Sequence, residues 1–418
     1  MTAPPRKVLA KNENGKISPA NAITQVQQQT PPDSESSSRI GSVLPSIHKS
    51  THSKMSAQHE LDDNPTDAIS SLQFSPSGNK LLVSSWDRSI SIYRRTEGEK
   101  PYTLEKRLET RAPALDVCWG ADESIAYFVG LDQDVRRLDL DNDEQLVLST
   151  HGAASNKVAY SAEHGLLLST SWDRTLHIHN TAIRDGKSFV KIELPAKPFA
   201  LRLTRQRAVV AMAERKMSVY DLGAFKLLTE QTSSEMADAG PGSDAVHVAP
   251  WQQRESCLKF MTRAVATMPD GTGFATSSIE GRVGVEWFDP EKQGNTYAFK
   301  CHRQTNQQTA EDGTQKDVDV VYPVNALSFH PVHGTFATGG GDGVVAIWDA
   351  QSKRRIRQYQ RLPASVAALD FTPDGKYMAI AISPGLEDGK DEDEIDRSLV
   401  KLIIRELSET EAKGKAAK

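Results

Sequence analysis

The chain has 418 residues, of which 38% are hydrophobic, and its mean hydropathy is −0.49. Its 50 Lys and Arg against 55 Asp and Glu give a net charge of −5, so a strongly basic nucleic-acid surface is not expected. No apolar run reaches the roughly 18 residues of a membrane span, and the N-terminus lacks the apolar stretch of a signal peptide. Cys118, Cys257 and Cys301 are too scattered for a disulfide framework or a zinc site, which points to the reducing cytosol or nucleus.

The first 56 residues differ in composition from the rest of the chain. They contain no aromatic residue and are rich in Ser, Pro, Gln and Asn, so they cannot bury enough apolar surface to offset chain entropy. Seven basic and three acidic residues up to Gln58 give a local charge of 7 − 3 = +4. We therefore predict a disordered, basic tail over residues 1–56, and favour a solvated tail over an electrostatic arm or a localisation signal. Residues 408–418 are predicted to form a second disordered tail.

Between these tails, over residues 57–407, the chain repeats a pattern of short strands. Each unit has an apolar run, a turn, a second run, a polar turn and a third, alternating run. The polar turn recurs at Asp87, Asp132, Asp173, Arg215, Gly281 and Asp342. The successive spacings are 45, 41, 42, 66 and 61 residues. The last two spacings predict insertions of roughly 20–25 residues before the fifth and sixth units.

A period of about 42 residues is typical of WD-repeat proteins. Seven units can be counted, and the sixth ends in the literal pair Trp348-Asp349. We therefore predict an all-β, seven-bladed WD-repeat β-propeller. The run from Gln58 to Asp63 is placed to add the outer strand of the last blade, which would close the ring and remove its open edges.

Catalytic motifs are not apparent. The sequence has no G-x-S-x-G, no Gly-rich phosphate loop and no H-E-x-x-H, and no cofactor or metal is expected. His151 and Asp173 fit a structural hydrogen bond better than an acid/base pair, and Asp87, Asp132 and Asp342 are expected to tie their turns to neighbouring strands. The acidic run from Glu387 to Asp396 lacks the spacing of a calcium loop and is expected to be solvated.

Two histidines lie on one predicted strand. His177 and His179 are two residues apart and so share a face of that strand, as metal ligands could. We expect instead that Leu176 and Ile178 point into the blade while both histidines face outward.

Two tryptophans offer a candidate binding surface. Trp86 and Trp172 directly precede the turn aspartates in SSWDRS and TSWDRT. Residues at these turns are expected at the mouth of the ring, where a large aromatic side chain can anchor a partner. The alternative is that both side chains fill gaps between blades.

A basic cluster is predicted beside these tryptophans. In the fifth unit, Lys259, Arg263 and Arg282 are expected to project toward the same mouth, with Arg254 just upstream. Arginine forks bind carboxylate or phosphate groups in a bidentate manner. On a chain of negative net charge this cluster favours an acidic or phosphorylated peptide, the alternative being ordinary surface ion pairs.

Several of these segments resemble a known family. RESCLKFMTR, SSIEGRVGVEWFDP, YAFKCHR and YPVNALSFHPVHGTFATGGGDGVVAIWD resemble a small eukaryotic propeller family that comprises mitotic-checkpoint propellers of the budding-uninhibited-by-benzimidazole type (third member) and messenger-RNA-export propellers of the Rae type. The likeness covers about residues 57–406. SSWDRSISIY and GLDQDVRRLDL look like the checkpoint type, whereas LDVCW and HPVHGT look more like the export type. We give the first set more weight because it includes residues of the predicted mouth.

The resemblance implies a non-enzymatic adaptor of the nucleus and the mitotic kinetochore. Its implied partners are the GLEBS-type acidic motif of a checkpoint kinase and of its pseudokinase relative, and phosphorylated Met-Glu-Leu-Thr repeats of the kinetochore scaffold. Arg263 and Arg282 would receive acidic or phosphate groups with Lys259 nearby, while Trp86 and Trp172 would contact the peptide. The alternative function is messenger-RNA export at the nuclear pore. Membrane partners and direct nucleic-acid binding are not expected.

Overall fold

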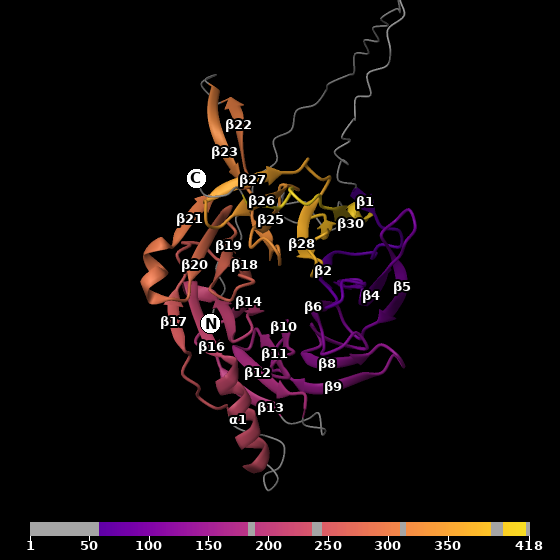
Figure 1. Ribbon diagram of the computed structural model, residues 1–418, viewed down its shortest axis with the longest axis vertical. Helices are drawn as coiled ribbons and strands as arrows, with labels where there is room; N and C mark the ends of the chain where they lie inside the picture. Colours follow the sequence, from indigo (N-terminus) through magenta and orange to yellow (C-terminus); the bar gives the residue numbers. More distant parts are fainter. Residues whose placement is uncertain (1–57, 183–188, 236–244, 310–314, 386–395, 415–418) are drawn as a thin grey trace, which may run out of the picture. The chain divides into compact units, whose positions relative to one another are not determined.

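The structure is a computed structural model that describes residues 58–182, 189–235, 245–309, 315–385 and 396–414. The predicted tail over residues 1–56 and most of the acidic run from Glu387 to Asp396 lie outside the described residues. The described residues form seven four-stranded antiparallel sheets and one separate hairpin. The prediction of a seven-bladed, all-β ring is confirmed (Figure 1).

The first three blades follow one another without large insertions. Blade 1 contains β2 (Ile69–Phe74), β3 (Lys80–Ser85), β4 (Ser89–Arg95) and β5 (Tyr102–Glu109). Blade 2 contains β6 (Ala114–Trp119), β7 (Ile125–Gly130), β8 (Asp134–Asp139) and β9 (Gln145–Thr150). Blade 3 contains β10 (Ser155–Ser161), β11 (Leu166–Ser171), β12 (Thr175–Asn180) and β13 (Phe189–Glu193).

The next two blades carry short helices. Blade 4 contains β14 (Pro198–Leu203), β15 (Arg207–Met212), the 3₁₀ turn η1 (Ala213–Arg215), β16 (Lys216–Asp221) and β17 (Gln252–Glu255), with helix α1 (Leu222–Glu235) between the last two strands. Blade 5 contains β18 (Thr262–Thr267), β19 (Gly273–Ser278), β20 (Arg282–Trp287), the 3₁₀ helix η2 (Pro290–Asn295) and β21 (Tyr297–Lys300).

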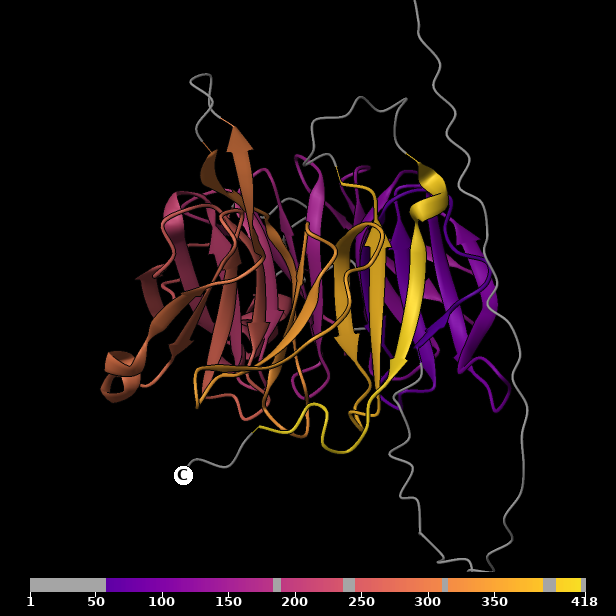
Figure 2. The ribbon, with the colours of Figure 1, turned by 90° about the horizontal axis from the view of Figure 1, so that it is seen from above.

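The hairpin and the last two blades complete the chain. The hairpin of β22 (Arg303–Thr309) and β23 (Gln315–Val321) stands above one face of the ring (Figure 2). Blade 6 contains β24 (Val324–Phe329), β25 (Phe336–Gly340), β26 (Val345–Asp349) and β27 (Arg354–Gln358). Blade 7 contains β28 (Ser365–Phe371), β29 (Tyr377–Ser383), η4 (Arg397–Leu399), β30 (Lys401–Glu406) and β1 (Gln58–Glu60). Helix α1 and this hairpin account for the two insertions predicted from the repeat spacing.

The ring closes through its two ends. Strand β1 pairs antiparallel with β30, with His59 opposite Ile404, and the amide of Leu61 donates to the carbonyl of Leu402 at 2.8 Å. This confirms that the run beginning at Gln58 supplies the outer strand of the last blade. Residues 408–414, which the sequence assigns to the C-terminal tail, pack against the ring: Ala412 is buried in the core, and Glu411 pairs with Arg405 at 2.9 Å.

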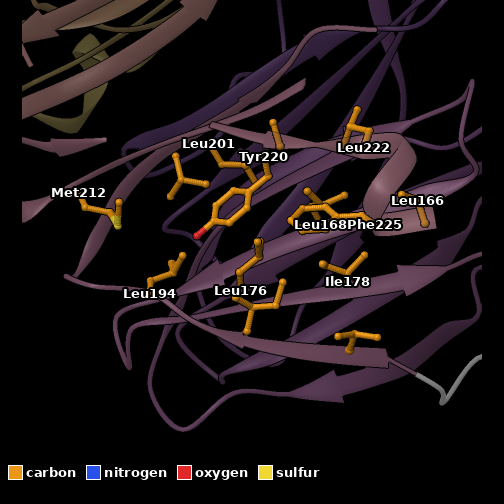
Figure 3. Close-up of a cluster of buried hydrophobic side chains, with 14 of the residues drawn as sticks. Leu166, Leu168, Leu176, Ile178, Leu194, Leu201, Met212, Tyr220, Leu222 and Phe225 are labelled. Carbon is orange, nitrogen blue, oxygen red and sulfur yellow. The ribbon is translucent and has the colours of Figure 1, made fainter. Parts of the chain in front are cut away.

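The hydrophobic core lies between neighbouring blades because each sheet is covered on both faces. Between blades 3 and 4, Leu168, Leu176 and Ile178 pack against Leu201 and Tyr220 (Figure 3). A chain of polar contacts runs through blade 6. Trp348 Nε1 donates to Thr338 Oγ1 at 3.0 Å, and Thr338 Oγ1 is 2.8 Å from His302 Nε2. His302 Nδ1 is in turn 2.8 Å from Asp342 Oδ1. Asp342 therefore ties its turn to the loop between β21 and β22, which holds His302, and not directly to a neighbouring strand.

Candidate functional site on the upper face of the ring

We call the upper face the side of the ring that carries the loops entering the inner strands and the turns between the second and third strands of each blade. Trp86 lies in the turn between β3 and β4, and Trp172 in the turn between β11 and β12. Their exposed fractions are 43% and 38%, which is high for tryptophan. The structure thus places both indoles at the surface rather than in gaps between blades.

The two tryptophan turns are fixed by the aspartates that follow them. Asp87 Oδ1 accepts from the amide of Ser89 at 3.0 Å, and its Oδ2 accepts from the amide of Thr66 at 2.8 Å. Asp173 repeats this arrangement with Thr175, at 2.9 Å, and with Gly152, at 2.6 Å. Each carboxylate joins its turn to the loop entering the same blade, so the indoles sit on a rigid base.

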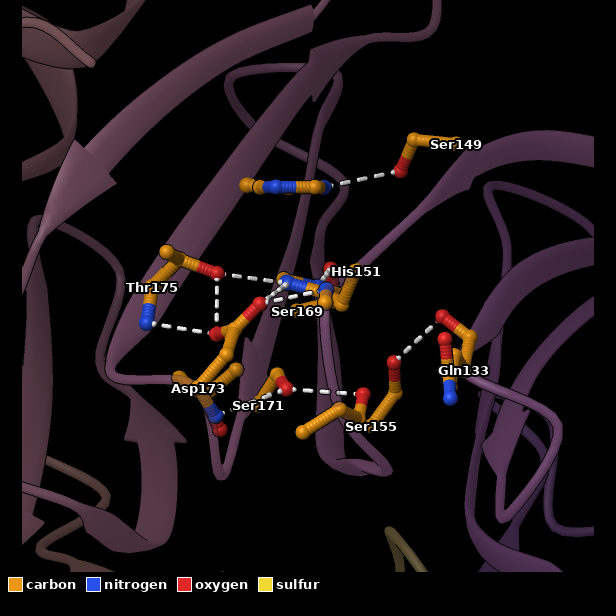
Figure 4. A network of polar contacts seen from close by, with 12 residues as sticks. Gln133, Ser149, His151, Ser155, Ser169, Ser171, Asp173 and Thr175 are labelled. Atoms are coloured by element: carbon orange, nitrogen blue, oxygen red, sulfur yellow. Dashed lines mark hydrogen bonds and ion pairs between the residues drawn. The ribbon is translucent and has the colours of Figure 1, made fainter.

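His151 and Asp173 belong to one buried polar network (Figure 4). Their closest atoms, Nδ1 and Oδ2, are 3.8 Å apart, and the two side chains are linked through Thr175, whose hydroxyl donates to Asp173 at 2.6 Å and lies 2.7 Å from His151 Nδ1. His151 Nε2 is 3.0 Å from the hydroxyl of Ser169. Burial lowers the pKa of His151 to about 4, with the Asp173 carboxylate opposing that shift. Each ring nitrogen of the imidazole has a structural partner, and the contact with Asp173 is indirect.

The expectation that His177 and His179 face outward is wrong. Their exposed fractions are 2% and 3%. The hydroxyl of Ser149, on the outer strand of blade 2, lies 3.0 Å from His177 Nδ1 and 2.9 Å from His179 Nε2, and the His177 ring stacks on His151 at 3.6 Å. Neighbouring blades cover both faces of a sheet, so side chains that alternate along β12 are buried on either face. Leu176 and Ile178 are buried on the face opposite the two histidines, as predicted.

Arg263 lies at the mouth of the central cavity. It is the second residue of inner strand β18, and its Nε and Nη2 donate to Asn325 Oδ1 at 3.2 and 3.0 Å. The cavity that opens here is also lined by Trp172 and Met261. Among the described residues, no carboxylate forms an ion pair with Arg263, so its charge is available to a ligand.

Arg282 and Lys259 lie on the same face in different settings. Arg282 begins β20, and its Nε is 3.1 Å from Glu280 Oε2. Glu280 also lies 3.9 Å from Arg303, at the base of the hairpin, so its charge is shared between two arginines. Lys259 is exposed in the loop that enters β18. The cations predicted near the mouth thus differ in how far nearby carboxylates neutralise their charge.

Arg254 differs from the other predicted residues. It lies on β17, the outermost strand of blade 4, and its guanidinium donates to the carbonyls of Trp287, at 2.7 Å, and Phe288, at 3.0 Å. Its Nη1 is also 3.9 Å from buried Glu286. These contacts join blade 4 to blade 5 and occupy most of its donors.

Sequence reasoning missed three exposed apolar side chains on the upper face. Phe260 and Met261 are exposed in the loop entering β18, and Ile279, whose amide donates to the carbonyl of Met261 at 3.1 Å, is exposed beside them. It also missed Lys197, whose ammonium lies 4.4 Å from the centre of a Trp172 ring. Phe260 and Met261 are adjacent in the sequence just before a predicted inner strand, and this apolar pair is the signal that could have indicated an exposed apolar surface.

The described residues hold no group of three or more His, Cys, Asp or Glu side chains placed to bind a metal ion. Nor is any helix in the part of the chain that the structure describes long and apolar enough to cross a membrane. The upper face presents exposed apolar and cationic side chains around a cavity.

Comparison with known proteins identifies the family. The family model described as WD domain, G-beta repeat matches residues 56–94, 142–180 and 320–349. The Mitotic checkpoint protein BUB3.1 of Arabidopsis thaliana is 37% identical over 86% of this chain and 96% of its own length. The chain belongs to the Bub3 family of mitotic checkpoint propellers.

Other relatives place the chain within this family. The Spindle assembly checkpoint protein bub3 of Schizosaccharomyces pombe is 34% identical over 78% of this chain and 92% of its own length. Protein Rae1 of Drosophila melanogaster is 28% identical over 77% of this chain and 86% of its own length. The resemblance read from the sequence is confirmed, and the Bub3 proteins are more similar to this chain than the Rae1 relative is.

Proposed function

We propose that this Bub3-family chain is a non-catalytic adaptor that binds short acidic and phosphorylated peptides on its upper face. Its partners would be the GLEBS-type acidic motif of a checkpoint kinase and its pseudokinase relative, and phosphorylated Met-Glu-Leu-Thr repeats of the kinetochore scaffold. It would act in the nucleus and at kinetochores in mitosis. The observation that carries the proposal is the meeting of Trp172, Met261 and Arg263 at one cavity mouth.

The unequal settings of the cations give each a separate expected role. Arg263 has a charge that no described carboxylate neutralises, so it would take the strongest anionic group of the peptide. Arg282 must share its charge with Glu280 and would contribute less, with Lys259 adding a weaker, exposed charge. Trp86 and Trp172 would cover apolar parts of the peptide. Arg254 would act indirectly, by holding blades 4 and 5 together.

The test is a calorimetric titration of the chain with one Met-Glu-Leu-Thr repeat peptide, with and without phosphate on its threonine. We expect clear preference for the phosphopeptide, because a dianionic phosphate gains charge-assisted hydrogen bonds that a hydroxyl cannot form. Arg263→Ala should weaken phosphopeptide binding by about tenfold or more, which is the loss of one such bond. Arg282→Ala should weaken it less.

The matched control is Arg205→Ala. Arg205 is exposed in the turn between β14 and β15, at the end of the strands opposite the upper face, and its loss should leave affinity unchanged. All variants should keep the wild-type melting temperature. Wild-type affinity in Arg263→Ala would remove the site assignment. Binding of a GLEBS peptide without any preference for phosphothreonine would favour the export function over the checkpoint function.

A further inference from the structure

The inner strands of the ring enclose a cavity that runs down from the upper face. Its volume is about 260 Å³, and it is lined by residues of β2, β6, β10, β14, β18, β24 and β28. All seven blades thus contribute to it. The cavity is large enough to hold a small solute together with water.

The lining of this cavity is chemically one-sided. Lys157 of β10, Arg202 of β14 and Arg263 of β18 line it from three consecutive blades. The opposite side, from blades 6, 7 and 1, carries only uncharged side chains, short ones such as Ser70, Ala326 and Ala368 and longer ones such as Leu72 and Leu369. The ionisable residues among the described lining are all cations.

Two carboxylates near these cations, Asp116 and Asp370, are absent from the described lining, and each accepts a hydrogen bond from a backbone amide. Asp116 is buried; its Oδ2 accepts from the amide of Val158 at 3.1 Å, and its Oδ1 lies 3.7 Å from Lys157 Nζ. Asp370 accepts from the amide of Phe74 at 2.8 Å, and burial raises its pKa to about 6. Near neutral pH these two groups offset only part of the three positive charges.

The positive charges of Arg202 and Arg263 also repel the charged form of Lys157. Burial lowers the pKa of Lys157, the charges of Arg202 and Arg263 lower it further, and Asp116 opposes the shift. Like charges held in a confined space are relieved when a multivalent anion enters it. Arginine and lysine donors are also the groups that bind phosphate oxygens in proteins.

We propose that the central cavity binds a small multivalent oxyanion of the phosphate class, held by Lys157, Arg202 and Arg263. Successive residues of a strand rise by about 3.3 Å, so cations at different positions along neighbouring inner strands offer donors at different depths. This spacing suits a pyrophosphate better than a single phosphate. The site shares the cavity mouth, at Trp172, Met261 and Arg263, with the proposed peptide site, whereas Lys157 and Arg202 belong to the cavity alone.

The test titrates pyrophosphate, and in a second series inorganic phosphate, into the full chain by calorimetry in a chloride buffer of constant ionic strength. We expect one saturable site, with pyrophosphate bound more tightly than phosphate. Lys157→Met and Arg202→Met should each weaken pyrophosphate binding by about tenfold or more, because each removes a charge-assisted contact. Arg205→Met removes an exposed arginine outside the cavity and should not change the affinity.

Two variants are needed because Lys157→Met leaves the buried Asp116 carboxylate without its cation and so alters stability. Arg202→Met removes a charge that favours the ionised form of the buried Asp370 and leaves Asp116 with Lys157, so the two variants perturb different carboxylates. Melting temperatures without ligand verify the fold of each variant. Absence of a saturable site in the wild type would overturn the proposal, as would wild-type affinity in Arg202→Met. Neither result depends on peptide binding, so the two proposals fail separately.

Discussion

At the scale of single residues, the environment decides what a side chain does more than its type. In the interface between blades 2 and 3, His151 stacks on His177, and the hydroxyl of Ser149 lies within hydrogen-bond distance of both His177 and His179. Strand alternation predicts that His177 and His179 share a face, which is correct. Strand alternation does not show whether that face is exposed to solvent, because in a ring of blades the neighbouring sheet covers the face.

The buried histidines predict acid sensitivity. The unfolded chain takes up protons at imidazoles near pH 6.5, whereas burial lowers the pKa of His151 to about 4 and that of His179 to about 3 in the folded protein. Stability is therefore fully present above pH 6.5 and is lost as the pH falls, by about 1.4 kcal/mol per pH unit for each such histidine. Burial raises the pKa of Asp370 to about 6 and also raises the pKa of Glu286, so these two carboxyl groups act in the opposite direction and offset part of the loss. Urea unfolding at several pH values measures the slope.

The control separates these histidines from exposed ones. His179→Leu should flatten the dependence of the free energy of unfolding on pH between 6 and about 4, where one titrating group is lost. His247→Gln, which changes an exposed histidine, should leave the slope as it is. Parallel curves for wild type and His179→Leu would contradict this account.

At the scale of elements, the two insertions show different degrees of integration. The hairpin of β22 and β23 pairs only with itself among the described strands. Helix α1, by contrast, places Leu222 and Phe225 in the core between blades 3 and 4 (Figure 3). The repeat spacing predicts both insertions but not their form, because the period of a repeat carries no information about residues that interrupt it.

Helix α1 gives a matched pair of variants. Phe225 is buried in that core, so Phe225→Ala should lower the free energy of unfolding by about 3–5 kcal/mol, through lost burial and a cavity. Leu227, two residues away on the same helix, is 62% exposed, and Leu227→Ala should change stability by less than about 0.5 kcal/mol. Urea denaturation of both variants checks this, and equal effects would show that the helix does not anchor through Phe225.

At the scale of the whole molecule, the order of the blades and the closing strand follow from the sequence because the repeat is local and regular. The upper face follows in part, since Trp86, Trp172 and Arg263 occupy recognisable positions in their repeats. The cationic cavity does not follow. Lys157, Arg202 and Arg263 are separated by 45 and 61 residues, and only the closed ring brings them to one space.

Closure of the ring can be weakened selectively. Leu61 follows β1 and is buried in the core between blades 7 and 1, so Leu61→Ala should cost about 2–5 kcal/mol. Asp62 forms an exposed ion pair with Lys100, and Asp62→Ala should cost less than about 1 kcal/mol. Thermal unfolding of the wild type and both variants tests the prediction, and an unaffected Leu61→Ala would contradict it.

The pairing of β1 with β30 also has a consequence for how the protein is made. The partners of His59 and Glu60 are Ile404 and Ile403, more than 340 positions later in the chain. During synthesis β1 leaves the ribosome before the other described strands and must remain without its partner until β30 has been translated. The early blades can assemble as they emerge, but the seventh can be completed only once β30 has emerged, so ring closure is a late, long-range step of folding.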